Sequence, residues 1–395
     1  MSEINTFSDA DVAGKRVLTR VDFNVPLKDG EVTDDTRIRA ALPTIQDLVN
    51  RGAKVVLCSH LGRPDGTGYQ EEYSLKPVAK HLEKLLGASV AFATDTVGDA
   101  AKKTVEGLRD GQVALLENLR FDKREKSNDP EFAKALASLG DVFVNDAFGA
   151  AHRAHASTAG VAEHLPSYAG ALMTKEVGTL TAMLDDPKRP FVAILGGSKV
   201  SDKVAVIDAL IDKCDTLIIG GGMCFTFLRA QGYATGTSLM EEEWIDRCKA
   251  MLSKAQEKGV KILLPTDVVC ADEFSNEAAI VTVPVTDIPD GMMGLDIGPM
   301  TTVQYGNAIA EGKTVFWNGP MGVFEMPSFE AGTKGVAIAV AENQDAVTVI
   351  GGGDSVAAVN QFNLADKMSF ISTGGGASME LVQGERLPGV EALRK

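Results

Sequence analysis

The sequence lacks several features that mark common classes of protein. Its 395 residues contain no apolar run close to the roughly 18 residues that span a bilayer, so we expect no membrane-spanning helix. The N-terminus has no basic region followed by an apolar stretch, which argues against a signal peptide. Neither GxxxxGK[ST] nor GxGxxG occurs, so neither a P-loop nor the usual dinucleotide-binding turn is supported.

Cysteine and histidine are also scarce. The five cysteines are widely spaced and contain no CxxC pair, which suggests no disulfide framework and predicts a cytoplasmic protein. His152 and His155 stand three residues apart, but no cysteine lies near them in sequence. A zinc site needs more ligands than this, so hydrogen-bonded loop histidines are the better interpretation. No GxSxG elbow is present, and no Ser-His-Asp arrangement can be argued.

Charge is unevenly placed along the chain. The net charge of −15 predicts that neither nucleic acid nor an anionic membrane is a partner. Yet ten of the fifteen arginines fall before residue 170, whereas paired glycines begin only at Gly196-Gly197. The two halves of the chain therefore differ in chemistry.

Length and pattern predict two α/β domains. The chain exceeds the roughly 250–300 residues at which single cores usually divide. Short β-branched runs alternate with helix-like segments, which is typical of parallel sheets. We expect a connecting helix at Thr174–Leu184 and a fresh strand at Phe191, with a hairpin excursion at Ala271–Pro289. The expected strands are Arg16–Val21, Lys54–Ser59, Gln112–Glu117, Asp141–Val144, Phe191–Leu195, Thr216–Ile219, Lys261–Leu264, Thr314–Trp317, Val347–Ile350 and Ser369–Ile371.

The unusual residues of the first half follow these strands. Ligands of open parallel sheets bind beyond the carboxyl ends of the strands. Arg37, Arg63, Arg120 and Arg153 can each bond a carboxylate or phosphate in bidentate fashion. Any one of them alone is more simply a surface or ion-paired residue. Four near strand ends predict a small ligand with several negative charges.

Glycine clusters follow the strands of the second half. Such turns let the backbone approach a phosphate, and a following helix N-terminus offers free N–H groups. A single cluster is more simply a tight βα turn, but several predict a nucleotide site. Asp354 lies among glycines and is the candidate ligand for Mg²⁺, which binds one or two carboxylates plus phosphate oxygens. Lys199 and Lys203 are spaced to reach one phosphate-binding region.

Long motifs resemble those of the phosphoglycerate kinase family. They run in the family order from the first strand to the C-terminal tail, although Ser198 stands where the family often has alanine. The motifs are RVDFNVP at Arg20–Pro26, SHLGRP at Ser59–Pro64, LENLRF at Leu116–Phe121, NDAFGAAHRAHAS at Asn145–Ser157, LGGSKVSDK at Leu195–Lys203, MGLDIGP at Met293–Pro299, WNGPMGVFE at Trp317–Glu325, GGGDS at Gly351–Ser355 and STGGGAS at Ser372–Ser378.

The resemblance implies a fold and a reaction. The fold is α/β, with two Rossmann-like parallel-sheet domains joined by a hinge helix. The implied parts are a 3-phosphoglycerate-binding domain at 1–172, a connecting helix and linker at 173–188, a nucleotide-binding domain at 189–378, and a tail at 379–395 that returns to the first domain. The reaction is reversible phosphoryl transfer between ATP and the carboxylate of 3-phosphoglycerate, giving ADP and 1,3-bisphosphoglycerate. In reverse it is the ATP-forming step of glycolysis. The family habit is a monomer.

The resemblance also implies residue roles. Transfer is assigned to Arg37, Lys199 and Gly375, and the metal to Asp354. The residues implied to bind 3-phosphoglycerate are Asp22, Asn24, Arg37, His60, Arg63, Arg120 and Arg153. The residues implied to bind ATP or ADP are Lys203, Gly294, Glu325, Gly352, Gly353, Asp354 and Ser355.

Two other functions are weighed against this one. A kinase acting on an unphosphorylated carboxylate, such as acetate or aspartate, would need fewer arginines. A non-catalytic two-domain anion-binding protein would not need Lys199, Lys203 and Asp354 together. A carboxylate acceptor is ionised at pH 7 and needs no general base, which agrees with the absence of an obvious one.

Overall fold

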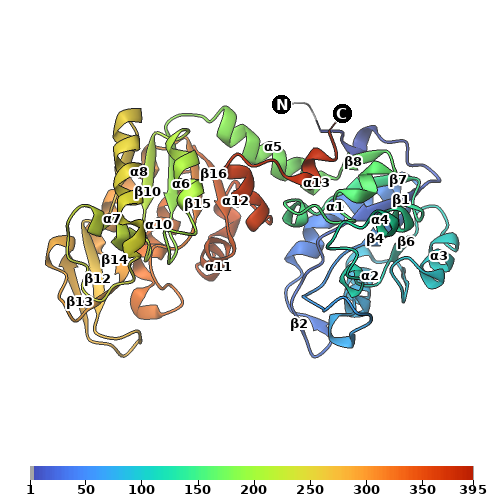
Figure 1. Ribbon diagram of the computed structural model, residues 1–395, viewed down its shortest axis with the longest axis horizontal. Helices are drawn as coiled ribbons and strands as arrows, with labels where there is room; N and C mark the ends of the chain where they lie inside the picture. Colours follow the sequence, from blue (N-terminus) through green and yellow to red (C-terminus); the bar gives the residue numbers. More distant parts are fainter. Residues whose placement is uncertain (1–3, 395) are drawn as a thin grey trace. The chain divides into compact units, whose positions relative to one another are not determined.

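The computed structural model describes residues 4–394 and divides into two compact units. Unit 1 comprises Met1–Thr179 and Arg386–Lys395, and unit 2 comprises Leu180–Glu385. In Figure 1 unit 1 runs from blue to green and also contains the last, red segment of the chain. Lys395, the last residue of the predicted tail, lies outside the described residues, as do Met1–Glu3 at the start of the predicted first domain.

Unit 1 is built on a six-stranded parallel sheet. Its strand order is β5-β6-β4-β1-β7-β8. The strands at its centre are almost entirely buried, and β4 and β7 are mostly apolar, as expected of a sheet that is covered on both faces. The strands are β1 (Arg16–Arg20), β4 (Lys54–Cys58), β5 (Val90–Phe92), β6 (Val113–Leu115), β7 (Val142–Asn145) and β8 (Ser167–Ala169), and a small hairpin joins β2 (Leu27–Lys28) to β3 (Glu31–Val32).

Unit 2 contains a second six-stranded parallel sheet. Its order is β11-β10-β9-β15-β16-β17, which is the Rossmann order 3-2-1-4-5-6 when the strands are numbered along the chain. The order reverses between β9 and β15, where such sheets bind ligands. The strands are β9 (Phe191–Leu195), β10 (Thr216–Ile219), β11 (Lys261–Leu263), β15 (Thr314–Asn318), β16 (Val347–Gly351) and β17 (Phe370–Ile371).

An antiparallel sheet of three strands interrupts the βα pattern of unit 2. Its order is β13-β12-β14, with β12 at Asp267–Ala271, β13 at Ile280–Pro284 and β14 at Met293–Ile297. The alternating exposure of β13 reflects a strand with one face toward solvent. The hairpin excursion predicted at Ala271–Pro289 is therefore confirmed, and it pairs with a third strand.

The helices begin and end at recognisable signals. In α2, Pro77 lies in the first turn and Gly87 ends the helix with a left-handed φ of 64°. No helix within residues 4–394 combines the length and apolar character needed to cross a membrane. The helices are α1 (Thr36–Asn50), α2 (Lys76–Leu86), α3 (Asp99–Glu106), α4 (Pro130–Ala137), α5 (Ala171–Asp185), α6 (Val204–Ile211), α7 (Cys224–Ala230), α8 (Ile245–Lys258), α9 (Pro299–Glu311), α10 (Ala331–Glu342), α11 (Gly353–Gln361), α12 (Gly376–Val382) and α13 (Pro388–Glu391).

The two-sheet α/β fold predicted from the sequence is confirmed, with local differences. The prediction missed β5 and β8, which are three residues long and pair at sheet edges. The helix α1 begins at Thr36, where the Asp34 carboxylate accepts hydrogen bonds from the Thr36 N–H and hydroxyl. This start places Arg37 in the first turn of α1.

Candidate functional site

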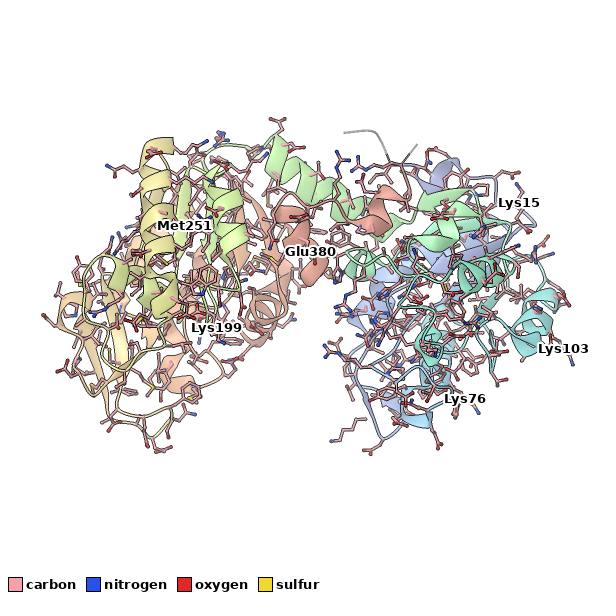
Figure 2. The ribbon with its side chains drawn as sticks, viewed as in Figure 1. Lys15, Lys76, Lys103, Lys199, Met251 and Glu380 are labelled. Carbon is pink, nitrogen blue, oxygen red and sulfur yellow. The ribbon has the colours of Figure 1, made fainter. Side chains whose placement is uncertain are left out.

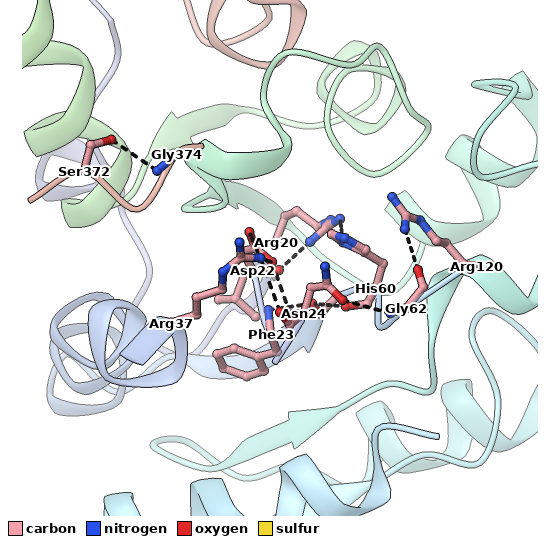
Figure 3. Close-up of polar contacts among 12 residues, drawn as sticks. Arg20, Asp22, Phe23, Asn24, Arg37, His60, Gly62, Arg120, Ser372 and Gly374 are labelled. Carbon is pink, nitrogen blue, oxygen red and sulfur yellow. Dashed lines mark hydrogen bonds and ion pairs between the residues drawn. The ribbon is translucent and has the colours of Figure 1, made fainter. Parts of the chain in front are cut away.

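Arg37 joins the loop after β1 to the start of α1. Its guanidinium Nη1 lies 3.1 and 3.2 Å from the carboxylate oxygens of Asp22 and 3.3 Å from the backbone oxygen of Asn24. The amide oxygen of Asn24 accepts a hydrogen bond of 2.8 Å from the Gly62 N–H. Figure 3 shows these contacts. Three segments far apart in sequence are thus held together at the carboxyl end of the sheet.

His60 follows β4 and lies in the same network. The buried Arg20, at the end of β1, has its Nη2 2.8 Å from His60 Nδ1 (Figure 3). Burial, followed by the charges of Arg20, Arg120 and Arg37, holds the pKa of His60 well below its usual range. His60 is therefore neutral near pH 7.

Arg120 brings an incompletely balanced positive charge into unit 1. Its side chain is 9% exposed, its Nη1 donates to the Gly62 backbone oxygen at 2.6 Å, and its Nε has no hydrogen-bond partner among the described residues. Burial, followed by the charges of Arg20 and Arg153, lowers the pKa of Arg120 to about 10. A cation in this state is stabilised by an anion that supplies both charge and acceptor atoms.

The remaining predicted arginines are exposed. Arg63 directly follows Gly62, and Arg153 donates from Nε to His152 Nε2 at 3.1 Å. Arg153 lies near enough to Arg120 to help lower its pKa. Contacts thus link Asp22, Asn24, Arg37 and Arg120 by way of Gly62, and His60 contacts Arg20. Arg63 and Arg153 lie at the exposed edge of this cationic cluster.

In unit 2 a cavity of about 330 Å³ lies at the carboxyl ends of β9, β15 and β16. Lys203 Nζ contacts the Asn318 amide oxygen, and burial lowers the pKa of Lys203 while Asp354 and Asp202 oppose that shift. Lys199 is exposed and lines the same cavity, and Figure 2 labels its position in unit 2. The predicted residues that line this cavity are Lys199, Lys203, Gly352, Gly353, Asp354, Ser355 and Gly375.

Glycine is required where this cavity meets two helices. Gly352 has φ +87° and precedes α11, and a Cβ there would lie 2.5 Å from Asn318 Nδ2. Gly375 has φ +53° and precedes α12. Both backbones therefore adopt conformations that favour glycine and leave N–H groups near the cavity.

A larger cavity of about 530 Å³ adjoins the first, because both are lined by Gly197, Ser198 and Asp354. Its walls include Phe225, Leu239, Phe274 and the predicted Gly294 and Glu325. A Cβ on Gly294 would lie 2.0 Å from the Phe225 ring, so only glycine leaves this wall undisturbed. A flat, largely apolar group fits this cavity, with its charged extension in the smaller one.

Three buried residues behind the cationic cluster were not singled out from the sequence as functional. Ser157 accepts a hydrogen bond from Arg20 Nε at 2.8 Å and donates to Glu125 at 2.5 Å. Arg20, Ser157 and Glu125 are at most 1% exposed. The position of Arg20 at the end of the first strand was a usable signal, but nothing in the sequence pairs it with a serine 137 residues away.

Metal binding has limited support from side chains alone. No group of three or more His, Cys, Asp and Glu that could hold an ion is found within residues 4–394. Asp354 is an exposed carboxylate at both cavities, and such a group suits Mg²⁺ when phosphate oxygens complete the coordination.

A cationic cluster on one parallel sheet and glycine-lined cavities with two lysines on another are features of a phosphotransferase. The phosphoglycerate kinase family model matches residues 7–385. The chain belongs to the phosphoglycerate kinase family, and it is a kinase, as the sequence predicted.

Individual relatives cover nearly the whole chain. A phosphoglycerate kinase of Trichodesmium erythraeum is 56% identical over 391 residues, which are 99% of this chain and 98% of that protein. Cytosolic phosphoglycerate kinase 3 of Arabidopsis thaliana is 57% identical over 394 residues, with the same coverage. The solved phosphoglycerate kinase of Coxiella burnetii has a TM-score of 0.92 at 44% identity and covers 99% of both chains.

Proposed function

We propose that the chain catalyses reversible transfer of a phosphoryl group between ATP and the carboxylate of 3-phosphoglycerate, giving ADP and 1,3-bisphosphoglycerate. Family membership supports this reaction. The observation that carries it in the structure is Arg120, a buried arginine whose Nε has no partner within residues 4–394 and whose pKa is lowered to about 10. An acceptor that bears its own phosphate supplies the missing negative charge.

The cationic cluster of unit 1 is the proposed site for 3-phosphoglycerate. The guanidinium groups of arginine bind phosphate and carboxylate oxygens in bidentate fashion, while neutral His60 presents a ring nitrogen for a hydrogen bond to the substrate. Asp22 and Asn24 hold Arg37 and the Gly62 segment in place through the contacts described above. The proposed binding residues are Asp22, Asn24, Arg37, His60, Arg63, Arg120 and Arg153.

The two adjoining cavities of unit 2 are the proposed nucleotide site. The larger cavity suits the base, and the smaller one, with its lysines and glycine turns, suits the phosphates. Asp354 would hold Mg²⁺, which supplies positive charge to the phosphate oxygens when it is bound. The proposed binding residues are Lys203, Gly294, Glu325, Gly352, Gly353, Asp354 and Ser355.

The chemistry needs positioning and charge neutralisation rather than a base. The acceptor carboxylate is ionised at pH 7, and the transferring phosphoryl group is also negative. Two unit charges about 4 Å apart repel by about 4 kcal/mol at an effective dielectric constant near 20. We assign Arg37, Lys199 and the backbone at Gly375 to offset this repulsion during transfer. Transfer further requires that the acceptor and the γ-phosphate come together with water excluded.

A coupled assay with ATP, Mg²⁺ and 3-phosphoglycerate tests this function. We expect ADP to form with 3-phosphoglycerate and far more slowly with unphosphorylated glycerate, because glycerate leaves the arginines without a phosphate. Equal turnover of both acceptors would favour a kinase of simple carboxylates. No transfer to either would overturn the proposal.

Location and assembly are proposals of the same kind. Within residues 4–394 all five cysteines are buried and unpaired, which supports a reducing cytoplasm. We propose that the active form is a monomer without nucleic acid or membrane partners. Sedimentation at the enzyme concentration of the assay tests this, and a stable dimer there would contradict it.

A further inference from the structure

Four segments of unit 1 meet in a buried chain of hydrogen bonds behind the cationic cluster. Glu125, in the loop after Phe121, accepts from the Ser157 hydroxyl at 2.5 Å and from the Ser157 N–H at 3.1 Å. Ser157 accepts from Arg20 Nε at 2.8 Å, and Arg20 Nη2 lies 2.8 Å from His60 Nδ1. Only His60 among these four is proposed to touch the substrate.

The direction of each hydrogen bond follows from the chemistry of the groups. An arginine is protonated and has no acceptor, so Arg20 must donate to both Ser157 and His60. The single proton of the Ser157 hydroxyl is then directed to Glu125. Because Nδ1 of His60 accepts, a neutral ring carries its proton on Nε2.

The charges around His60 favour this neutral ring. Arg20 comes from β1, Arg37 from α1 and Arg120 from the segment Leu119–Phe121, and His155 is a further titratable neighbour. Burial and these neighbours hold the pKa of His60 well below its usual range. The pKa of His155 is lowered to about 4, so this second ring adds no positive charge near pH 7.

Glu125 supplies the opposite charge that a buried arginine needs. Burial raises the pKa of Glu125, while the charges of Arg20 and Arg120 and the bonds from Ser157 oppose that rise. An unpaired buried charge would be strongly unfavourable. A further bond from Arg20 Nη1 to the Val21 backbone oxygen fixes the guanidinium plane.

We propose that Glu125 and Ser157 are positioning residues that act through Arg20 to hold His60 as a neutral ring with its proton on Nε2. His60 then meets an anionic substrate as a hydrogen-bond donor before any ligand arrives. The identity of the anionic substrate rests on the proposed function, but the protonation state and tautomer proposed for the His60 ring do not.

Nuclear magnetic resonance of the full chain labelled with ¹⁵N-histidine tests the ring state directly. Long-range ¹⁵N–¹H correlation spectra separate protonated from unprotonated ring nitrogens, and the His60→Gln spectrum identifies the His60 signals among five histidines. We expect an unprotonated Nδ1 and a protonated Nε2 without ligand, unchanged between pH 5.5 and 8. A ring that gains a proton within this range, or one protonated at Nδ1, would overturn the proposal.

Two variants test whether Ser157 and Arg20 set this state. Ser157→Ala removes the hydroxyl that links Arg20 to Glu125, with little loss of side-chain volume. Arg20→Lys keeps the positive charge but loses the planar guanidinium that donates to two partners at once. We expect each to give mixed His60 tautomers and to raise the KM for 3-phosphoglycerate at least about tenfold, as for a lost charged hydrogen bond. The KM for ATP should stay within twofold. Ser138→Ala, at an exposed serine of the same unit, should change neither.

The readouts distinguish this proposal from the proposed function. Phosphoryl transfer could be absent while His60 keeps its proton on Nε2 in the wild type and loses this preference in both variants. In that case the proposed function is wrong, but the proposed role of Glu125 and Ser157 in positioning His60 is supported. If both variants are folded and active and keep the wild-type His60 tautomer, then Glu125 and Ser157 only stabilise the loops, and the positioning proposal is wrong. Circular dichroism confirms folding in each case.

Discussion

Arg120 is a buried, positively charged residue whose hydrogen-bonding groups are not all satisfied within residues 4–394. Because its Nε lacks a partner among the described residues, a bound anion gains a hydrogen bond there without breaking one. Arg120→Lys keeps one charge but cannot bind in bidentate fashion, so we predict at least a tenfold rise in the KM for 3-phosphoglycerate. Steady-state kinetics measure this. Arg124→Lys, at an exposed arginine paired with Asp122, is the matched control. An unchanged KM in Arg120→Lys would remove it from the site.

Arg37 differs from Arg120 because it is proposed to act in transfer as well as in binding. Its guanidinium is held by Asp22 and is about 38% exposed, so it is oriented yet accessible to a ligand. We predict that Arg37→Ala abolishes transfer, because charge repulsion in the transition state is no longer offset, while nucleotide affinity stays nearly intact. Turnover and calorimetric titration with ATP measure the two effects. Wild-type turnover in this variant would exclude Arg37 from catalysis.

Asp354 is the proposed ligand of Mg²⁺. We predict that Asp354→Asn weakens the binding of Mg-ATP at least tenfold and leaves the binding of 3-phosphoglycerate unchanged. Titration calorimetry with each ligand measures this, with Asp366→Asn as an exposed control in the same unit. In excess chelator the difference between variant and wild type should vanish, because the metal is gone. Equal loss of both ligands would instead indicate misfolding.

At the scale of elements, the turn between β16 and α11 is tightly constrained. Gly352 combines a φ of +87° with a close approach to Asn318, which in turn contacts Lys203. A sparsely populated backbone conformation of this kind costs an L-residue roughly 1–3 kcal/mol, so we predict that Gly352→Ala raises the KM for ATP by about tenfold or more.

Gly232 provides the control for this prediction. It has a φ of +94°, and a Cβ there would meet no atom of residues 4–394 within 4 Å. Gly232→Ala therefore also places an L-residue at a positive φ, but without the clash. If both variants raised the KM for ATP equally, strain in the fold rather than the shape of the turn would be the cause.

The same scale shows what sequence could predict. Strands such as β9 and β10 were placed to the residue because their apolar runs are bounded by polar turns. The edge strand β5 has only three residues, so its alternation of buried and exposed residues is too short to be recognised as a strand in the sequence. Arginines and glycine turns at strand ends were visible as motifs. The link from Glu125 through Ser157 to Arg20 was not, because such partners are set by tertiary packing rather than by local pattern.

At the scale of the whole molecule, each unit contains a buried carboxyl group that resists ionisation. Burial raises the pKa of Asp146 in unit 1 and that of Asp296 in unit 2 to about 7. Asp146 accepts hydrogen bonds from the Leu172 and Met173 N–H groups at the start of α5. Asp296 accepts from the Gly332 N–H at the start of α10. Each carboxyl group anchors a helix, yet its charged form is disfavoured.

The sign of the pH dependence follows from proton binding. Between about pH 4 and 7 the folded chain keeps a proton on Asp146 that the unfolded chain has released. The free energy of unfolding therefore falls as pH rises through this range, by up to about 1.4 kcal/mol for each unit of pKa shift. Stability from this group is complete below the unfolded pKa near 3.8 and is lost as pH passes the folded pKa.

Asp146→Asn should remove this dependence because the amide keeps the shape and an acceptor oxygen but does not titrate. We predict that the free energy of unfolding of unit 1, measured in urea, depends less on pH between 4 and 7 in the variant, and that the variant is more stable than the wild type at pH 8.

The two units can be followed by different signals. Both tryptophans, Trp244 and Trp317, lie in unit 2, so tryptophan fluorescence follows that unit, whereas circular dichroism follows both. Asp146→Asn should therefore change the dichroism transition and leave the fluorescence midpoint in place, and Asp296→Asn should shift the fluorescence midpoint. If Asp146→Asn kept the pH slope of the wild type, Asp146 would be ionised in the folded protein across the range from pH 4 to 7, and the prediction would be wrong.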